Sequence, residues 1–176
     1  MVLDNLVFIL DFSIFFFWKY YWWFFLLKGD IMVDTIDRFD GKYLFLSNFY
    51  ICDVEYEGIV YPHTEAAFHA QKVFDDETKL KFTNVSPRKS KRLGHKVKLR
   101  EDWNEVKDNI MYEVCKAKFE QNEDIRKLLL ETGDAILIEG NTWNDQYWGI
   151  CRGKGRNQLG KTLMRIRDEL REWPFF

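Results

Sequence analysis

The sequence feature that most constrains the fold is a long amphipathic helix expected over residues 102–120. Its apolar side chains recur at helical spacing, so they form one stripe along the helix. Asp102 or Asn104 would cap the N-terminus, and Trp103 stands beside that cap. The stripe comprises Val106, Ile110, Met111, Val114, Cys115, Ala117 and Phe119. A stripe of this length needs other elements to cover it, so it predicts a core around which the rest of the chain packs.

Shorter elements are expected on both sides of this helix. Residues 36–61 predict short strands and turns, with a turn at Asp40-Gly41, a β-like run from Tyr43 to Phe45, and a hairpin over 54–61 around Glu57-Gly58. Further helices are expected over about 65–74, from Asp75 onward, from Ser86-Pro87 to Gly94, over 123–131 and over 157–173. A buried strand is expected at 135–138 and a loop at 141–149. With no repeat or linker inside 32–176, a chain of 176 residues predicts one α+β, mainly α, domain.

Residues 1–31 are unusually aromatic and allow three interpretations. Lys19 divides the apolar run, and a membrane span needs ~20 mostly apolar residues, which disfavours a transmembrane anchor. A signal peptide would carry basic residues before the run, whereas this one carries Asp4. We favour a division into an aromatic-rich tail, 1–31, and a functional domain, 32–176, that begins at Met32. An amphipathic or anchoring tail is the second choice.

Composition excludes several function classes. The net charge of −2 gives no global attraction to nucleic acid. Three scattered cysteines with no C-x-x-C pair indicate neither a zinc site nor a disulfide framework, so a reducing compartment, the cytoplasm, is expected. No cluster of His, Cys and Asp has metal-ligand spacing, so we expect no metal and no cofactor. No stable membrane partner is expected for 32–176, and the sequence leaves the oligomeric state open.

Residues 61–72 predict the start of a helix with ionisable groups on one face. Pro62 ends the preceding extended segment, and Thr64 is a plausible N-cap. The face carries Glu65, Phe68, His69 and Lys72 at i, i+3, i+4 and i+7. A carboxylate, an imidazole and an amine beside an aromatic ring could act as acid, base or nucleophile. The alternative is an exposed charged face, which this window alone favours.

Two features concern phosphate binding. Residues 79–100 hold nine Lys or Arg and no acid, which could bind phosphates or form a solvated surface. Residues 155–162 match the pattern G-x-x-x-x-G-K-[ST], but residues 150–154 predict a poor strand and too few residues follow to build a sheet. We therefore interpret this match as accidental, with Asn157 capping the last helix.

Two further segments are weak signals when taken alone. Asn144-Asp145 with Trp148-Gly149 could hold a polar ring by stacking and hydrogen bonding. The alternative is a structural Asx-turn with Trp148 in the core. Ser47-Asn48-Phe49 is a polar turn before a buried aromatic.

Taken together and in this order, the segments resemble the NADAR, or YbiA-like, family over about residues 39–171. The motifs are Ser-Asn-Phe, Tyr-Pro-x-x-Glu-x-x-Phe-x-Ala-Gln-Lys, a Trp after the basic stretch, Asn-Asp-x-Tyr-Trp-Gly and Gly-Lys-Gly-x-Asn-x-Leu-Gly-x-x-Leu-Met. The resemblance implies a compact, mainly helical domain of about six helices with a few short strands. It also implies N-glycosidase activity on ADP-ribosyl substrates, such as ADP-ribosylated guanine, or on phosphoribosylated pyrimidine intermediates of riboflavin synthesis.

The resemblance also implies roles for individual residues. By this resemblance Glu65 and Lys72 would be catalytic. Cleavage of a C1′–N bond builds positive charge on the ribose and requires a proton at the leaving nitrogen, so the chemistry makes the carboxylate of Asp145 a further catalytic candidate beside Glu65. Trp103 and Trp148 would stack on rings, while Ser47, Asn48, Phe49, Gly149 and Asn157 would position substrate. The basic stretch with Lys154 or Arg156 would meet phosphates. His69 stands where the family commonly has Gln, so it adds a titratable group or replaces an amide contact. The alternative is a non-catalytic module that binds ADP-ribose or a nucleotide.

Overall fold

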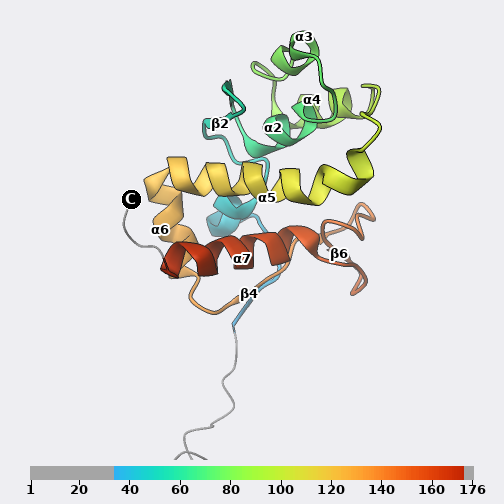
Figure 1. Cartoon of the computed structure of the whole chain (residues 1–176). Coiled ribbons are helices and arrows are strands. Elements are labelled where there is room, and N and C mark those ends of the chain that lie inside the picture. The colour runs from blue at the N-terminus through green and yellow to red at the C-terminus, as the bar shows by residue number, and fades with distance from the viewer. Residues whose placement is uncertain (1–33, 173–176) are drawn as a thin grey trace, which may run out of the picture. The chain divides into compact units, whose positions relative to one another are not determined.

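The computed structural model describes residues 34–172, and the proposed tail, 1–31, lies outside the described residues. Within this range the chain forms one 3₁₀ helix, six α-helices and six short strands (Figure 1). This agrees with the expected α+β, mainly α, domain. Among residues 34–172, no helix combines the length and the apolar character that crossing a membrane requires.

Helix α5 (Trp103–Gln121) is the central element, as the apolar stripe predicts. Its buried side chains are Trp103, Ile110, Met111, Val114, Cys115, Lys118 and Phe119. It packs against α2 (Thr64–Ala70) and β2 (Val54–Tyr56) on one side and against α6 (Glu123–Glu131) and α7 (Gln158–Glu172) on the other. In Figure 1 the red helix α7 runs alongside α5 while α2, α3 and α4 lie on the opposite side. The core therefore forms on both sides of α5.

The hairpin and helix α2 sit on the first side. β2 pairs antiparallel with β3 (Ile59–Tyr61), and Glu57 and Gly58 turn with φ of 51° and 76°, which a two-residue hairpin requires. Thr64 was expected to cap α2, and this is wrong. His63 is the cap, because its Nδ1 accepts the Ala66 N–H at 3.0 Å. Its Nε2–H donates to the carbonyl of Val85 at 2.9 Å, which fixes the tautomer.

Helices α3 (Asp76–Leu80) and α4 (Pro87–Gly94) follow. Asp75 caps α3 through the N–H of Thr78 at 2.8 Å, and Ser86 precedes Pro87 at the start of α4, as predicted. Gly94 was expected to end α4 as a C-cap glycine, but it is the last helical residue and His95 is the cap. Helix α4 packs directly against α2.

The other four strands have two residues each and form two parallel pairs. β1 (Thr35–Ile36) pairs in parallel with β4 (Ile136–Leu137), and β5 (Gly140–Asn141) pairs in parallel with β6 (Ile150–Cys151). The β-like run predicted from Tyr43 to Phe45 is wrong, because residues Gly41–Leu46 form the 3₁₀ helix η1. The buried Lys118 explains this conformation, since its Nζ donates to the carbonyls of Phe45 and Ser47 at 2.6 and 2.9 Å.

The segment that matches G-x-x-x-x-G-K-[ST] forms the turn into α7. The helix begins at Gln158, so Lys161 lies in its first turn with an exposed side chain. Gly160 is buried, and a Cβ there would lie 2.1 Å from the carbonyl oxygen of Leu137. This glycine therefore allows α7 to pack against β4, which agrees with reading the match as accidental.

Candidate active site

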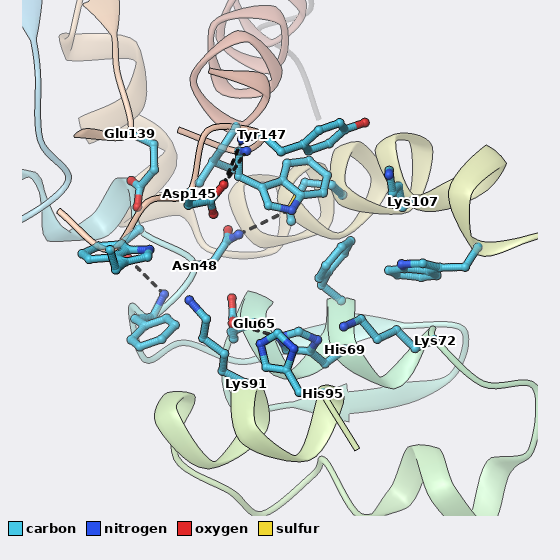
Figure 2. Close-up of a pocket in the computed structure, with 18 residues that line it drawn as sticks. Asn48, Glu65, His69, Lys72, Lys91, His95, Lys107, Glu139, Asp145 and Tyr147 are labelled. Atoms are coloured by element: carbon cyan, nitrogen blue, oxygen red, sulfur yellow. Dashed lines mark hydrogen bonds and ion pairs between the residues drawn. The ribbon is translucent and has the colours of Figure 1, made fainter. Parts of the chain in front are cut away.

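A cavity of about 500 Å³ opens between helices α2 and α4, helix α5 and the loop that joins β5 to β6. This volume lies within the range of small-molecule sites. Figure 2 shows labelled side chains around it, with Glu65 and Lys91 facing Glu139 and Asp145. The lining residues are Ser47, Asn48, Phe49, Glu65, Phe68, His69, Lys72, Lys91, His95, Trp103, Lys107, Met111, Glu139, Trp143, Asp145, Tyr147, Trp148 and Leu159.

Glu65 and His69 form one wall. Every residue of α2 is buried, so its polar side chains need partners. The Nε2–H of His69 donates to Glu65 Oε1 at 3.0 Å, one helical turn away. Burial lowers the pKa of His69 although Glu65 opposes the shift, so the imidazole is neutral at pH 7. A neutral donor thus orients the carboxylate while leaving its other oxygen available.

Lys72 lies in the same wall although α2 is shorter than expected. The helix ends at Ala70, so Lys72 belongs to the following turn. Its Nζ donates to the carbonyl of Gly94 at 3.0 Å and lies 5.7 Å from the centre of the Trp103 ring. Burial lowers the pKa of Lys72, and Glu65 opposes this shift. A lowered pKa favours the neutral amine that either a proton transfer or a nucleophilic step would use.

The contact between α2 and α4 depends on a glycine. A Cβ on Gly94 would lie 2.3 Å from His69 Nδ1 and 2.4 Å from His69 Cγ. Contacts this short do not occur, so only glycine permits α4 to lie against the imidazole. Gly94 also supplies the carbonyl that binds Lys72.

The Ser47-Asn48-Phe49 turn carries the adjacent wall. The Asn48 carbonyl accepts the Glu65 N–H at 3.0 Å, and its side chain contacts Met111 Sδ at 3.3 Å. The Ser47 carbonyl is bound by the buried Lys118. Burial lowers the pKa of Lys118 to about 8. Backbone contacts therefore tie this turn to both α2 and α5, which makes it a fixed part of the cavity.

Asp145 shapes the opposite loop. Its Oδ1 accepts the N–H groups of Tyr147 and Trp148 at 3.1 and 2.9 Å. Its own N–H and carbonyl are bound by the side chain of Asn141 at 3.0 and 2.7 Å. This is the Asx-turn alternative that the sequence left open, and it coexists with a place in the cavity lining.

Glu139 is a lining carboxyl that the sequence interpretation missed. It follows β4, and its Oε2 is buried without a hydrogen-bond partner among the described residues. Burial raises its pKa to about 7, and Asp145 and Glu65 add to that shift. The available signal was an acid directly after a short buried strand and before a Gly-Asn pair. The site thus brings together three carboxyl groups rather than the two that were expected.

Aromatic rings form most of the apolar lining. Phe68 stands between Trp103 and Trp148, with ring centres 5.2 and 5.4 Å away. Trp143 lines the cavity while remaining 59% exposed, so it sits at the mouth. Tyr147 packs edge-on against Trp148 at 5.0 Å. These rings offer stacking surfaces for a planar group.

Cations approach the cavity from two helices. Lys91 of α4 lies 5.6 Å from the Trp143 ring centre, and Lys107 of α5 lies 4.4 Å from that of Tyr147. Of the nine Lys and Arg side chains in residues 79–100, the cavity lining includes Lys91, and His95 of the same stretch also lines it. Lys79 pairs with Glu57 at 2.7 Å and Arg100 with Asp102 at 2.6 Å, so those two charges are compensated.

The structure brings most of the predicted site residues into one cavity. The residues that line it are Ser47, Asn48, Phe49, Glu65, His69, Lys72, Trp103, Asp145 and Trp148. Gly149 and Asn157 lie outside the lining. Asn157 does not cap α7 with its side chain, because Oδ1 accepts the Glu139 N–H at 3.0 Å and Nδ2 donates to Leu137 O at 2.8 Å. Within residues 34–172, no three His, Cys, Asp or Glu side chains are grouped to hold a metal ion.

Comparisons with known proteins identify the family to which the chain is similar. The sequence model of the NADAR domain matches residues 36–171. N-glycosidase YbiA of Escherichia coli is 39% identical over 147 residues, covering 80% of this chain and 91% of that protein. A riboflavin biosynthesis protein of Vibrio vulnificus is 35% identical over 153 residues, covering 83% of this chain and 41% of that protein. The NMR structure of E. coli YbiA superimposes with a TM-score of 0.71 at 38% identity, covering 81% of this chain and 88% of that one.

Proposed function

This chain belongs to the NADAR domain family, and we propose that it is an N-glycosidase that hydrolyses an ADP-ribosyl or phosphoribosyl-pyrimidine N-glycoside. The observation that carries the proposal is that Glu65 and Lys72 line one cavity together with aromatic rings and the lysines Lys91 and Lys107. Relatives named N-glycosidases support the reaction class. The free thiols of its three cysteines support a reducing compartment, and we propose the cytoplasm.

The carboxylate of Glu65 would stabilise the positive charge that develops on the sugar during the reaction. As the C1′–N bond of an N-glycoside breaks, positive charge develops on C1′ and the ring oxygen. Glu65 lies in a wall that excludes much of the solvent, being 9% exposed, so its electrostatic effect on that charge is stronger than in water. The bond from His69 keeps the carboxylate oriented. Glu65 would stabilise the cation or take a proton from the attacking water.

Lys72 is placed to act beside Glu65. Its buried amine has a lowered pKa and would donate a proton to the leaving nitrogen or attack C1′ of the opened sugar. Asp145 would contribute by fixing the Tyr147-Trp148 loop and by adding negative charge near the ribose. Stacking by Trp103 and Trp148 would hold the base, and Lys91 and Lys107 would bind phosphate.

A product assay on a substrate panel tests the proposal. The panel comprises phosphoribosylaminopyrimidines, ADP-ribosylated guanine in DNA and RNA, and ADP-ribosylated protein, with chromatographic detection of released base and sugar phosphate. We expect turnover of one class by the full chain, and loss of about 10²–10⁴-fold for both Glu65→Gln and Lys72→Ala. The controls are Glu131→Gln and Lys161→Ala, which change exposed residues outside the cavity.

Two results would contradict the proposal. Full activity in both Glu65→Gln and Lys72→Ala would show that these cavity residues do not take part in catalysis. Tight binding of a substrate with no turnover by the wild-type chain would instead indicate a nucleotide-binding module.

A further inference from the structure

The backbone of Glu139 is fixed by contacts with other segments of the chain. Its N–H donates to Asn157 Oδ1 at 3.0 Å, and its carbonyl accepts the Ile150 N–H at 2.9 Å. Gly149 packs so closely that a Cβ there would lie 2.1 Å from the Glu139 carbonyl and 3.0 Å from its Cγ. Gly149 and Asn157, the two predicted site residues outside the lining, therefore both fix the backbone of Glu139. Figure 2 shows its carboxyl on the side of the cavity opposite Glu65.

The surroundings of this carboxyl favour its neutral form. Its Oε2 is buried and has no hydrogen-bond partner among the described residues, whereas Glu65 receives a bond from His69. The charged groups that act on Glu139 are Asp145 in the β5–β6 loop, Glu65 on α2, Asp40 before η1, and Lys91 on α4. Burial and the three carboxylates raise the pKa of Glu139 to about 7, and Lys91 opposes them. Two carboxyl groups in one site with different environments are the arrangement that supplies an acid and a base together.

We propose that Glu139 is the catalytic acid that protonates the leaving nitrogen of the N-glycoside, opposite Glu65. This inference rests on the proposed N-glycosidase function. In the step, the C1′–N bond breaks with its electron pair going to nitrogen, and the Glu139 proton moves to that nitrogen. Water adds to C1′ and gives a proton to Glu65. Glu65 releases that proton and Glu139 regains one from solvent, so the net reaction consumes one water.

The rival proton donor is Lys72. Its Nζ is bound to the Gly94 carbonyl and lies beside Trp103, on the α2 side of the cavity. Glu139 differs in having an oxygen that the described residues leave unpaired. The Glu139 side chain lines the cavity opposite Glu65, and its Oε2 has no hydrogen bond within the described residues to give up before a proton is transferred.

The decisive experiment compares two leaving groups in Glu139→Gln, which keeps size and shape but cannot donate a proton. One substrate is a phosphoribosylaminopyrimidine, whose amine needs a proton to leave. The other is nicotinamide mononucleotide, whose pyridinium nitrogen needs none. We expect kcat on the first to fall by about 10²–10⁴-fold with little change in KM, and kcat on the second to fall by less than tenfold. Equal losses on both substrates would overturn the acid role in favour of a structural one.

A pH profile decides the question even if the pyridinium substrate is not turned over. An acid works in its protonated form, so kcat/KM of the wild type should fall as pH rises above about 7. Glu139→Gln should lack this alkaline limb. Asp145→Asn keeps the oxygen that accepts the loop N–H groups but removes a negative charge, so it should shift the limb to lower pH. If the alkaline limb of kcat/KM is unchanged in both Glu139→Gln and Asp145→Asn, another group donates the proton to the leaving nitrogen.

The controls separate this inference from the proposed function. Glu131→Gln, an exposed glutamate at the end of α6, should match the wild type. If the wild type releases no product from any substrate, the proposed function and the inference fail together. If the wild type is active and Glu139→Gln equals Glu131→Gln, the acid assignment alone is overturned.

Discussion

Replacing Gly94 by alanine tests whether the α2–α4 contact sets the geometry of the Glu65 wall. The new Cβ would lie 2.3 and 2.4 Å from Nδ1 and Cγ of the His69 ring and 2.9 Å from the His69 Cβ, where ordinary contacts begin at 3.4 Å. The ring would have to move by roughly an ångström in a close-packed interior. Since His69 is 5% exposed and binds Glu65 at 3.0 Å, that movement breaks the bond that orients the carboxylate.

The expected cost follows from two opposing effects. Overpacking of a filled site costs about 1–3 kcal/mol, and contacts this short place Gly94→Ala in the upper part of that range. Alanine in a helix gains up to about 1 kcal/mol over glycine, and Gly94 has no left-handed backbone angle to lose. We expect a net loss of about 1–2 kcal/mol in the free energy of unfolding, with a fall in kcat from the displaced carboxylate.

Urea unfolding measures this effect in four chains: the wild type, Gly94→Ala, His69→Ala and the double variant. At a typical slope of about 2 kcal/mol per molar urea, the midpoint should fall by roughly 0.5–1 M. In a His69→Ala background the clash is absent, so Gly94→Ala should be neutral or stabilising. The double-mutant cycle should therefore give a coupling energy of about 2 kcal/mol between positions 94 and 69. A Gly94→Ala chain as stable as the wild type, or equal costs in both backgrounds, would refute the argument.

Three further predictions concern buried polar groups and the cavity mouth. Lys118→Met removes the side-chain donor from the Phe45 carbonyl, while the Ser47 carbonyl keeps the Tyr50 N–H, so the variant should lose about 1–3 kcal/mol in the free energy of unfolding. Because the folded state lowers the pKa of Lys118 to about 8, the wild type should gain stability relative to the variant between pH 8 and 10, measured by urea midpoints. Asn157→Ala loses the hydrogen bonds to the Glu139 N–H and to the Leu137 carbonyl of β4, so in the product assay kcat should fall by a larger factor than KM changes. An unchanged kcat would contradict a positioning role for Asn157. Trp143→Ala removes an exposed ring, so KM should rise while the unfolding free energy changes by less than about 0.5 kcal/mol.

Local patterns predicted much of the fold because the relevant contacts are near in sequence. The hairpin follows from Glu57-Gly58 between apolar runs, and the bounds expected for α6 agree with the structure. The run Tyr43 to Phe45 failed because its conformation depends on Lys118, more than 70 residues away. The cap of α2 failed for a similar reason, since His63 is fixed by the carbonyl of Val85.

The candidate site shows the same difference between residues defined by nearby sequence and residues defined by distant contacts. Glu65 and Lys72 stand in one motif, so the sequence predicts their shared face, and Asp145 is a candidate because it is a loop carboxylate close to Trp148. Glu139 was missed because its character comes from burial and from carboxylates on distant segments, which no local window contains. Gly149 and Asn157, which fix the backbone of Glu139, belong to recognisable motifs, but the sequence does not reveal this contact between distant segments.

The two facing walls of the cavity come from different halves of the described chain, and this has a consequence for how activity arises. A nascent polypeptide that reaches Gly133 already contains Glu65, Lys72 and the whole of α5, but it lacks Glu139 and the loop that faces them. Catalysis would therefore begin only after α7 docks on α5, so turnover would report completed folding. A break in the turn at residues 132–134 would separate the walls into two polypeptides, and complementation between such fragments would restore the enzyme through the α5–α7 contact.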